Sequence, residues 1–343
     1  MRLFIIGDVH WSEYSSILRG QGERYSVRLE NLIKTIDWCE STAKERGCDR
    51  VAYLGDFFDK PTLNDREISA LKEVRWEESL PHDFIVGNHE SSVSGLRFSS
   101  TKTLEREGFA VRDTPSDEEW GGVQLCFLPY ITEDDRKPLA EYFRKADGKR
   151  VVLSHNDIKG ISFGRVESKS GFPIGEIEGN ADLYVNGHLH NGAWVTKKIL
   201  NLGNITGQNF GEDAYRYEHH AAILDTDTLI LEFIENPYAL NFEQIDVKST
   251  RDVENLDLKK GGMVVNFRCA DGLIPSLREA LKAFGKDRLV ESRITSVKEP
   301  TKKSGEESPK LEAIDGDGKF SEFMLDRLGD SDIVKQEIAE VLR

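Results

Sequence analysis

The sequence predicts an α/β fold, a two-sheet sandwich flanked by helices, followed by a small α+β unit and a C-terminal helical tail. Short β-branched runs alternate with amphipathic stretches over about the first 235 residues, as in layered α/β proteins. Five of these runs end in a Gly or Ser next to Asp, Asn or His. At 343 residues the chain also exceeds the roughly 250–300 at which single cores stop growing, so a second unit is expected.

The first unit is predicted to span residues 1–240. Its strands are short runs rich in Val, Ile, Leu and Phe, at 2–6, 50–54, 84–86, 123–128, 150–154, 183–186, 199–202, 221–224 and 229–234. Apolar side chains recur at helical spacing in residues 27–46 and 65–77, which predicts a helix over each. The number of strands is sufficient for two sheets that pack face to face.

A smaller α+β unit is predicted at residues 245–297, after Asn236-Pro237 ends the first. It is expected to contain a strand, a helix and a strand, at 263–268, 275–284 and 289–297. Residues 298–319 are rich in Lys, Glu, Ser, Gly and Pro and have few large apolar groups, which is typical of a flexible linker. Residues 320–343 return to helical spacing and are predicted to form a helical tail.

Composition limits the function classes. The formal net charge is −15, from 46 basic and 61 acidic side chains, which argues against gripping nucleic acid by bulk electrostatics. Any contact with DNA would have to be local, metal-mediated or shared with a partner. No run approaches 18 apolar residues, so no membrane segment is expected. The four cysteines form no CxxC pair, which favours reduced thiols and a cytoplasmic protein.

Polar side chains follow five predicted strands at the point where each strand ends. The five segments are Gly7-Asp8-Val9-His10, Gly55-Asp56-Phe57-Phe58-Asp59, Gly87-Asn88-His89-Glu90, Ser154-His155-Asn156 and Gly187-His188-Leu189-His190. In open α/β sheets functional groups gather outside the carboxyl ends of the strands, so these side chains are expected to meet. Each segment alone is a weak signal, whereas five in one chain form a strong one.

The residue types indicate a metal centre. Imidazoles, carboxylates and an amide, with no cysteine among them, form a mixed nitrogen and oxygen set suited to Mn²⁺, Fe²⁺ or Zn²⁺. A carboxylate such as Asp56 can bridge two cations, and such a pair both activates water and stabilises charge on an attacked phosphate. Hydrolysis of phosphate esters is the reaction that this chemistry favours.

The order DxH, GDxxD, GNHx, a strand-end His and GHxH resembles the motifs of the calcineurin-like metallophosphoesterase superfamily. The resemblance implies two divalent metal ions, with manganese expected. One would be held by Asp8, His10, Asp56 and His190. The other would be held by Asp56, Asn88, His155 and His188.

Two further residues receive catalytic roles from the same resemblance. His89 is similar to the residue that donates to the scissile phosphate or protonates the leaving oxygen. Glu90 stands where SbcD-type DNA exonucleases usually have Asp, and it is expected to hydrogen-bond and orient His89. The spelling Gly-Asn-His-Glu is that of Ser/Thr protein phosphatases, but those enzymes have Arg-Gly where this chain has Lys60-Pro61, and they lack GHxH.

Within the superfamily the chain resembles SbcD-type exonucleases, and most closely their compact phage-encoded members. The points of likeness are the segment 55–59, Glu212 after Leu202-Gly203-Asn204, and the layout of a capping domain at 245–297, a linker and a tail. The resemblance implies a DNA exonuclease and endonuclease acting in repair or recombination. It also implies an SMC-like ATPase partner of the SbcC type, docked by the tail 320–343, and leaves a homodimer open.

Two other functions remain open on the sequence. The same metal pair would serve a phosphoprotein phosphatase or a small-substrate phosphodiesterase. A non-catalytic interaction subunit is the third reading, and the intact set of expected ligands disfavours it.

Overall fold

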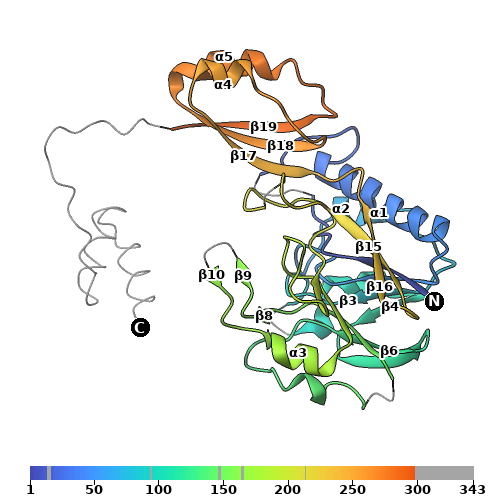
Figure 1. Ribbon diagram of the computed structural model, residues 1–343. Coiled ribbons are helices and arrows are strands. Elements are labelled where there is room, and N and C mark those ends of the chain that lie inside the picture. Colours follow the sequence, from blue (N-terminus) through green and yellow to red (C-terminus); the bar gives the residue numbers. More distant parts are fainter. Residues whose placement is uncertain (14–16, 93–94, 146–147, 164–165, 213, 298–343) are drawn as a thin grey trace, which may run out of the picture. The chain divides into compact units, whose positions relative to one another are not determined.

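The computed structural model describes residues 1–13, 17–92, 95–145, 148–163, 166–212 and 214–297 (Figure 1). The predicted linker 298–319 and tail 320–343 lie outside the described residues. The described chain contains two six-stranded sheets, which confirms the predicted α/β two-sheet fold. In the described part, no helix combines the length and apolar character needed to cross a membrane.

The first sheet has the strand order β16-β15-β1-β2-β3-β4. Strands β1 to β4 run parallel to one another, and β15 and β16 add antiparallel pairs at one side. The bounds are β1 (Arg2–Ile6), β2 (Arg50–Tyr53), β3 (His82–Ile85), β4 (Phe109–Arg112), β15 (His220–Asp225) and β16 (Ile230–Glu235). The parallel arrangement brings the carboxyl ends of β1, β2 and β3 to one edge.

The second sheet has the order β13-β14-β12-β7-β6-β5, with β14, β12, β7 and β6 parallel. The bounds are β5 (Ser116–Trp120), β6 (Val123–Leu128), β7 (Arg150–Ser154), β12 (Leu183–Asn186), β13 (Ala193–Trp194) and β14 (Ile199–Asn201). Four two-residue strands pair apart from it: β8 (Ile158–Lys159) with β11 (Phe172–Pro173), and β9 (Ser162–Phe163) with β10 (Val166–Glu167). This sheet likewise delivers the ends of β7 and β12 to one edge.

Side chains that alternate along β1 show how the layers pack. Leu3 and Ile5 are buried among apolar residues of the second sheet, whereas Phe4 and Ile6 point to the other face, toward α1 (Val27–Glu45). Cys126 and Val152 of the second sheet face outward and pack with α3 (Ile174–Asn180). The two sheets therefore share one core, and helices cover their outer faces.

Helix α2 (Asp65–Leu71) is shorter than predicted: the apolar spacing of the sequence predicted a helix to residue 77. The backbone amide of Arg75 donates to Asp37 Oδ1 at 2.7 Å, and that of Glu77 donates to Glu40 Oε2 at 3.0 Å. Both acceptors lie on α1. These amides bond to carboxylates of the neighbouring helix in place of helical carbonyls, so the chain leaves the helix at Lys72.

A third, three-stranded sheet has the order β17-β18-β19 and is entirely parallel. Its elements are β17 (Asn241–Val247), α4 (Thr250–Glu254), β18 (Met263–Cys269), α5 (Ile274–Leu281) and β19 (Leu289–Ser296). Short 3₁₀ turns occur at η1 (Leu96–Phe98), η2 (Ser100–Leu104), η3 (Leu139–Glu141) and η4 (Asp271–Leu273). Met263, Phe267 and Leu277 belong to a separate apolar core of this unit.

Candidate metal centre

All seven predicted metal ligands lie in turns that follow β1, β2, β3, β7 and β12, so both large sheets contribute. Three of these residues have positive φ angles, 53° at His10, 45° at Asp56 and 72° at His188. Residues other than glycine rarely adopt a positive φ angle, and backbone strain of this kind clusters at functional sites. The strained backbone at these three residues therefore directs their side chains toward the other predicted ligands.

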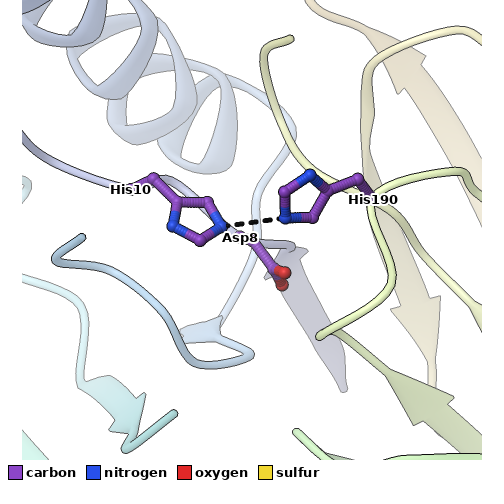
Figure 2. Close-up of side chains that lie close together, drawn as sticks. All are labelled: Asp8, His10 and His190. Carbon is purple, nitrogen blue, oxygen red and sulfur yellow. Dashed lines mark hydrogen bonds between the residues drawn. The ribbon is translucent and has the colours of Figure 1, made fainter. Parts of the chain in front are cut away.

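The first group of donors consists of Asp8, His10 and His190, whose ligand atoms all lie within 4.8 Å of one another (Figure 2). Nε2 of His10 lies 3.1 Å from Nε2 of His190. Asp8 Oδ1 accepts a hydrogen bond from the His188 amide at 3.0 Å, whereas its Oδ2 is buried without a hydrogen-bond partner. A buried carboxylate oxygen without a partner is costly unless a cation meets it.

The second group consists of Asp56, His155 and His188, again with all ligand atoms within 4.8 Å. Asn88 joins this group, because its Oδ1 lies 3.1 Å from Nε2 of His155 and 3.0 Å from Nδ1 of His188. Oxygen and nitrogen lone pairs thus converge from several directions. Such a donor set fits a divalent cation of the borderline class.

Asp56 connects the two groups. Its Oδ2 lies 3.2 Å from Nε2 of His155 in the second group and 4.0 Å from Nε2 of His10 in the first. Its Oδ1 accepts the backbone amide of His89 at 2.9 Å, which fixes the carboxylate. The residues present therefore fit a pair of cations with Asp56 between them. Their roles as ligands, and manganese as the metal, stay predictions.

Carboxylates that the sequence did not single out as site residues hold three of the histidines, and Asp59 Oδ1 lies 3.1 Å from Nδ1 of His10. Glu212 Oε1 lies 3.0 Å from Nδ1 of His190, and Asp157 Oδ1 lies 3.2 Å from Nε2 of His188. In each case the other ring nitrogen faces the donor group, as in carboxylate–histidine–metal arrangements. Glu212 had a weak signal, since it was noted only as a point of family likeness, and Asp157 stands two residues after His155.

His89 differs from the predicted ligands in exposure. Its side chain is 44% exposed, whereas those of His10 and His155 are 2% and 0% exposed. Its Nδ1 lies 3.5 Å from Oδ1 of Asp59, and this interaction is the main cause that raises the pKa of His89 to about 9. Asp59 was quoted in the GDxxD motif without a role of its own. An exposed, protonated imidazole at the rim of the centre is placed to donate to a bound substrate.

Glu90 has a different role from the predicted one. Its Oε1 accepts the amide of Phe58 at 2.9 Å and its Oε2 accepts the amide of Gly87 at 2.8 Å, so it does not orient His89. Asp59 is the carboxylate beside His89. Burial, followed by the negative charge of Asp56, raises the pKa of Glu90 to about 7. Glu90 therefore ties the turn after β2 to the turn after β3.

The centre attracts positive charge. Burial disfavours the charged form of His155, but the neighbouring Asp56 and Asp8 outweigh burial and raise the pKa of His155 to about 9. Asp56 is buried as well, yet His155 and His10 lower its pKa. Protons and metal ions compete for the same lone pairs, so the carboxylates that favour a proton on His155 would also favour a bound cation.

Comparison with known proteins agrees with this geometry. The family model described as calcineurin-like phosphoesterase matches residues 1–192, more than half of the chain. A solved structure, a dimetal phosphatase from Danio rerio, is similar over 68% of this chain and 98% of that chain, at 12% identity and a TM-score of 0.38. That likeness is too weak to bear on function, and no curated protein matches the chain. The chain belongs to the calcineurin-like phosphoesterase family, which consists of hydrolases of phosphoester bonds.

Proposed function

We propose that this phosphoesterase is a Mn²⁺-dependent DNA exonuclease and endonuclease, the nuclease subunit that acts beside an SMC-like ATPase of the SbcC type. The observation that carries the hydrolytic part is the sharing of Asp56 between two donor groups, with its Oδ2 3.2 Å from His155 and 4.0 Å from His10. DNA as the substrate rests on the SbcD-like motif spelling and on the unit that follows the phosphoesterase region.

The chain's own residues divide the work of hydrolysis. Asp8, His10 and His190 would hold one cation, and His155, His188 and Asn88 the other, with Asp56 between them. Two such cations supply an activated water and neutralise charge on the attacked phosphate. His89, charged and exposed, would donate to the phosphate or to the leaving oxygen, and Asp59 would hold its ring in place.

The third sheet supports the DNA assignment. SbcD-type enzymes carry a capping domain after the phosphoesterase domain, and here β17, β18 and β19 form a parallel sheet with its own core beyond residue 240. The segment Gly55-Asp56-Phe57-Phe58-Asp59 has the SbcD-like spelling, and Phe57 and Phe58 are fully buried beneath the turn that aims Asp56. A net charge of −15 fits a subunit that receives DNA together with a partner.

A second candidate is a phosphoprotein phosphatase or small-substrate phosphodiesterase. The spelling Gly87-Asn88-His89-Glu90 favours it, because it is the phosphatase spelling of this motif. A non-catalytic subunit is disfavoured, since all seven expected donors are present and lie together.

The deciding experiment is Mn²⁺-dependent digestion of linear DNA labelled at either end, run beside a phosphopeptide and a cyclic nucleotide. We expect shortening of the labelled DNA, with the polarity given by which label is released first. Turnover of the phosphopeptide or the cyclic nucleotide with intact DNA would favour the second candidate. Omission of Mn²⁺, and Asp56→Ala with Mn²⁺ present, are the controls for contaminating nucleases.

A further inference from the structure

A groove opens beside the second donor group. Its volume is about 700 Å³, within the usual range for ligand sites, and its lining includes Leu96, Pro115, Pro129, Tyr130, Ile131 and Tyr142. The ring of Tyr130 lies 5.8 Å from the ring of His188, centroid to centroid. The groove therefore adjoins the second donor group, because its lining residue Tyr130 neighbours the predicted ligand His188.

A second contact joins the groove to the centre. Ser91 also lines it, and its hydroxyl donates to the backbone carbonyl of Asn88 at 3.0 Å. Asn88 in turn belongs to the second donor group. Ser91 and Tyr130, which both line the groove, thus lie beside predicted ligands. A substrate whose phosphate lies at the centre would have its adjoining part directed into the groove.

The lining is mostly apolar, and its charged members are one cation, Lys137, and one carboxylate, Asp135. The rings of Tyr130 and Tyr142 offer planar surfaces, and Leu96, Ile131 and Pro115 add aliphatic contact. The Lys137 ammonium can meet a negative charge on a ligand in the groove. A ligand with a flat, weakly polar body and an attached negative charge matches these features.

We propose that this groove binds an unpaired nucleobase next to the phosphate being cut, with the base stacked on Tyr130 and the next phosphate near Lys137. The inference rests on the proposed function as a DNA nuclease and adds where and how the strand is held. Every base has a flat face that can stack on an aromatic ring, so such a site tolerates any sequence.

The charge of the protein favours stacking over electrostatic grip. At a net charge of −15 the chain as a whole repels the phosphate backbone. Base stacking does not depend on neutralising phosphates, so it can contribute affinity where ionic contacts contribute little. A base can enter the groove only when it is unpaired. The groove therefore selects single strands and frayed ends over intact duplex.

The test uses the full chain with Mn²⁺ and a single-stranded tetranucleotide whose phosphorothioate linkages slow hydrolysis. One version carries 2-aminopurine at each position in turn, and a matched version is abasic at that position. The readouts are the affinity ratio between the two versions and the quenching of 2-aminopurine. We expect tighter binding of the base on the order of tenfold at one position, as for one base on an aromatic ring.

Variants separate the groove from the rest of the protein. Tyr130→Phe should keep the affinity ratio, whereas Tyr130→Leu and, independently, Leu96→Glu should bring it close to one. Ile230→Glu is the matched control, because Ile230 is 65% exposed on β16 and should tolerate the charge with the ratio unchanged. Because each ratio is taken within one variant, a general loss of affinity does not alter it. Raising the salt should weaken binding of both versions and leave the ratio unchanged.

The outcomes distinguish this inference from the proposed function. If linear DNA is digested but the abasic and base-containing strands bind equally, the groove assignment is wrong and the nuclease assignment stands. If the ratio survives both Tyr130→Leu and Leu96→Glu, the base binds elsewhere and the inference is again wrong. If neither form of the oligonucleotide binds and DNA is not digested, both proposals fall. Position-specific quenching that is lost with the Tyr130 ring and kept in Tyr130→Phe supports the inference.

Discussion

Oδ2 of Asp56 lies 3.2 Å from Nε2 of His155. Asp56 follows β2 of the first sheet and His155 follows β7 of the second, so this contact joins the two sheets. The same oxygen is 4.0 Å from His10, which belongs to the other donor group. We therefore expect Asp56→Ala to lose both metal ions and to reduce phosphodiester cleavage to background. Metal analysis of the purified variant checks this expectation, with Asp227→Ala, an exposed carboxylate in a turn, as the control. A fully active Asp56→Ala enzyme would sink the assignment.

His89→Ala should behave differently, because its exposed ring, although its ligand atom lies within 4.8 Å of those of His10 and Asp59, belongs to neither predicted donor group. We expect two bound metals and a fall in turnover of about 100- to 10,000-fold, the usual contribution of a general acid. Metal content and turnover are measured on the same preparation. A metal-free His89→Ala protein would show that His89 is a ligand rather than a proton donor.

Glu212→Gln tests the carboxylate that holds His190. The loss of charge 3.0 Å from Nδ1 should lower metal affinity by about 10- to 100-fold, as is typical when a partner of a metal-binding histidine is removed. Titration of the metal-free protein with Mn²⁺ gives the two affinities. Because Glu212 contacts only the first donor group, one of the two sites should weaken while the other keeps its affinity. Equal weakening of both sites, or of neither, contradicts this prediction.

Metal affinity should depend on pH in a definite direction. The pKa of His155 in the metal-free protein is raised to about 9, so at pH 7 this ring carries a proton that a metal ion must displace. Affinity should therefore rise between pH 7 and 9 and fall as the solution becomes more acidic. Calorimetric titration at pH 7 in two buffers of different ionisation enthalpy counts the protons released. Binding without proton release at pH 7 would contradict the raised pKa.

Glu90 bonds two backbone amides, so its substitution should loosen the turns that carry Asp56 and Asn88. In Glu90→Gln the amide group would face a backbone N–H with an N–H of its own, which leaves a buried donor unpaired at a cost of about 1–3 kcal/mol. We expect a lower free energy of unfolding and weaker metal binding, while Glu90→Asp keeps one bond and loses less. Denaturant unfolding of the metal-free variants measures the difference. If Glu90→Gln matches the wild type in both stability and turnover, the tie between the two turns has no importance.

The tail 320–343 is predicted to dock the ATPase partner. Its apolar residues recur at helical spacing, and a short isolated helix of this kind is unstable in water without a partner. Removal of residues 320–343 should spare Mn²⁺-dependent activity of the isolated chain and abolish co-purification with the ATPase. A truncated chain that still forms the complex, or that unfolds, would overturn this docking role.

The sequence predicted those features, such as strand bounds, that depend on residues close together in the chain. The strands at 2–6, 123–128, 150–154 and 183–186 have the predicted bounds, because three of these apolar runs end at polar turns and the run 123–128 ends at Pro129. The five strand ends brought their polar side chains together because the parallel strands of each sheet end at one edge, and the residues at the two edges meet. Among strands of three or more residues, β4, β5 and β17 were missed: Ser116–Trp120, for example, reads as SDEEW and has no apolar alternation.

Contacts between distant segments could not be read from the sequence. Glu212 meets His190 across 22 positions, and only the path of the intervening chain brings them together. Glu90 was assigned to its neighbour His89, yet it reaches the amide of Phe58, 32 positions away. Helix α2 ends early for the same reason, since acceptors on α1 take the amides that would have continued it. In each case tertiary hydrogen bonds decide the outcome.

Each donor group draws on both large sheets. Asp8 and His10 follow β1 of the first sheet and meet His190, which follows β12 of the second. A bound ion would therefore act as a cross-link between the layers, much as a disulfide joins two strands. During synthesis neither group is complete until residues near 190 have left the ribosome, so no shorter N-terminal fragment can hold the pair. A chelator should likewise speed unfolding by releasing one sheet from the other.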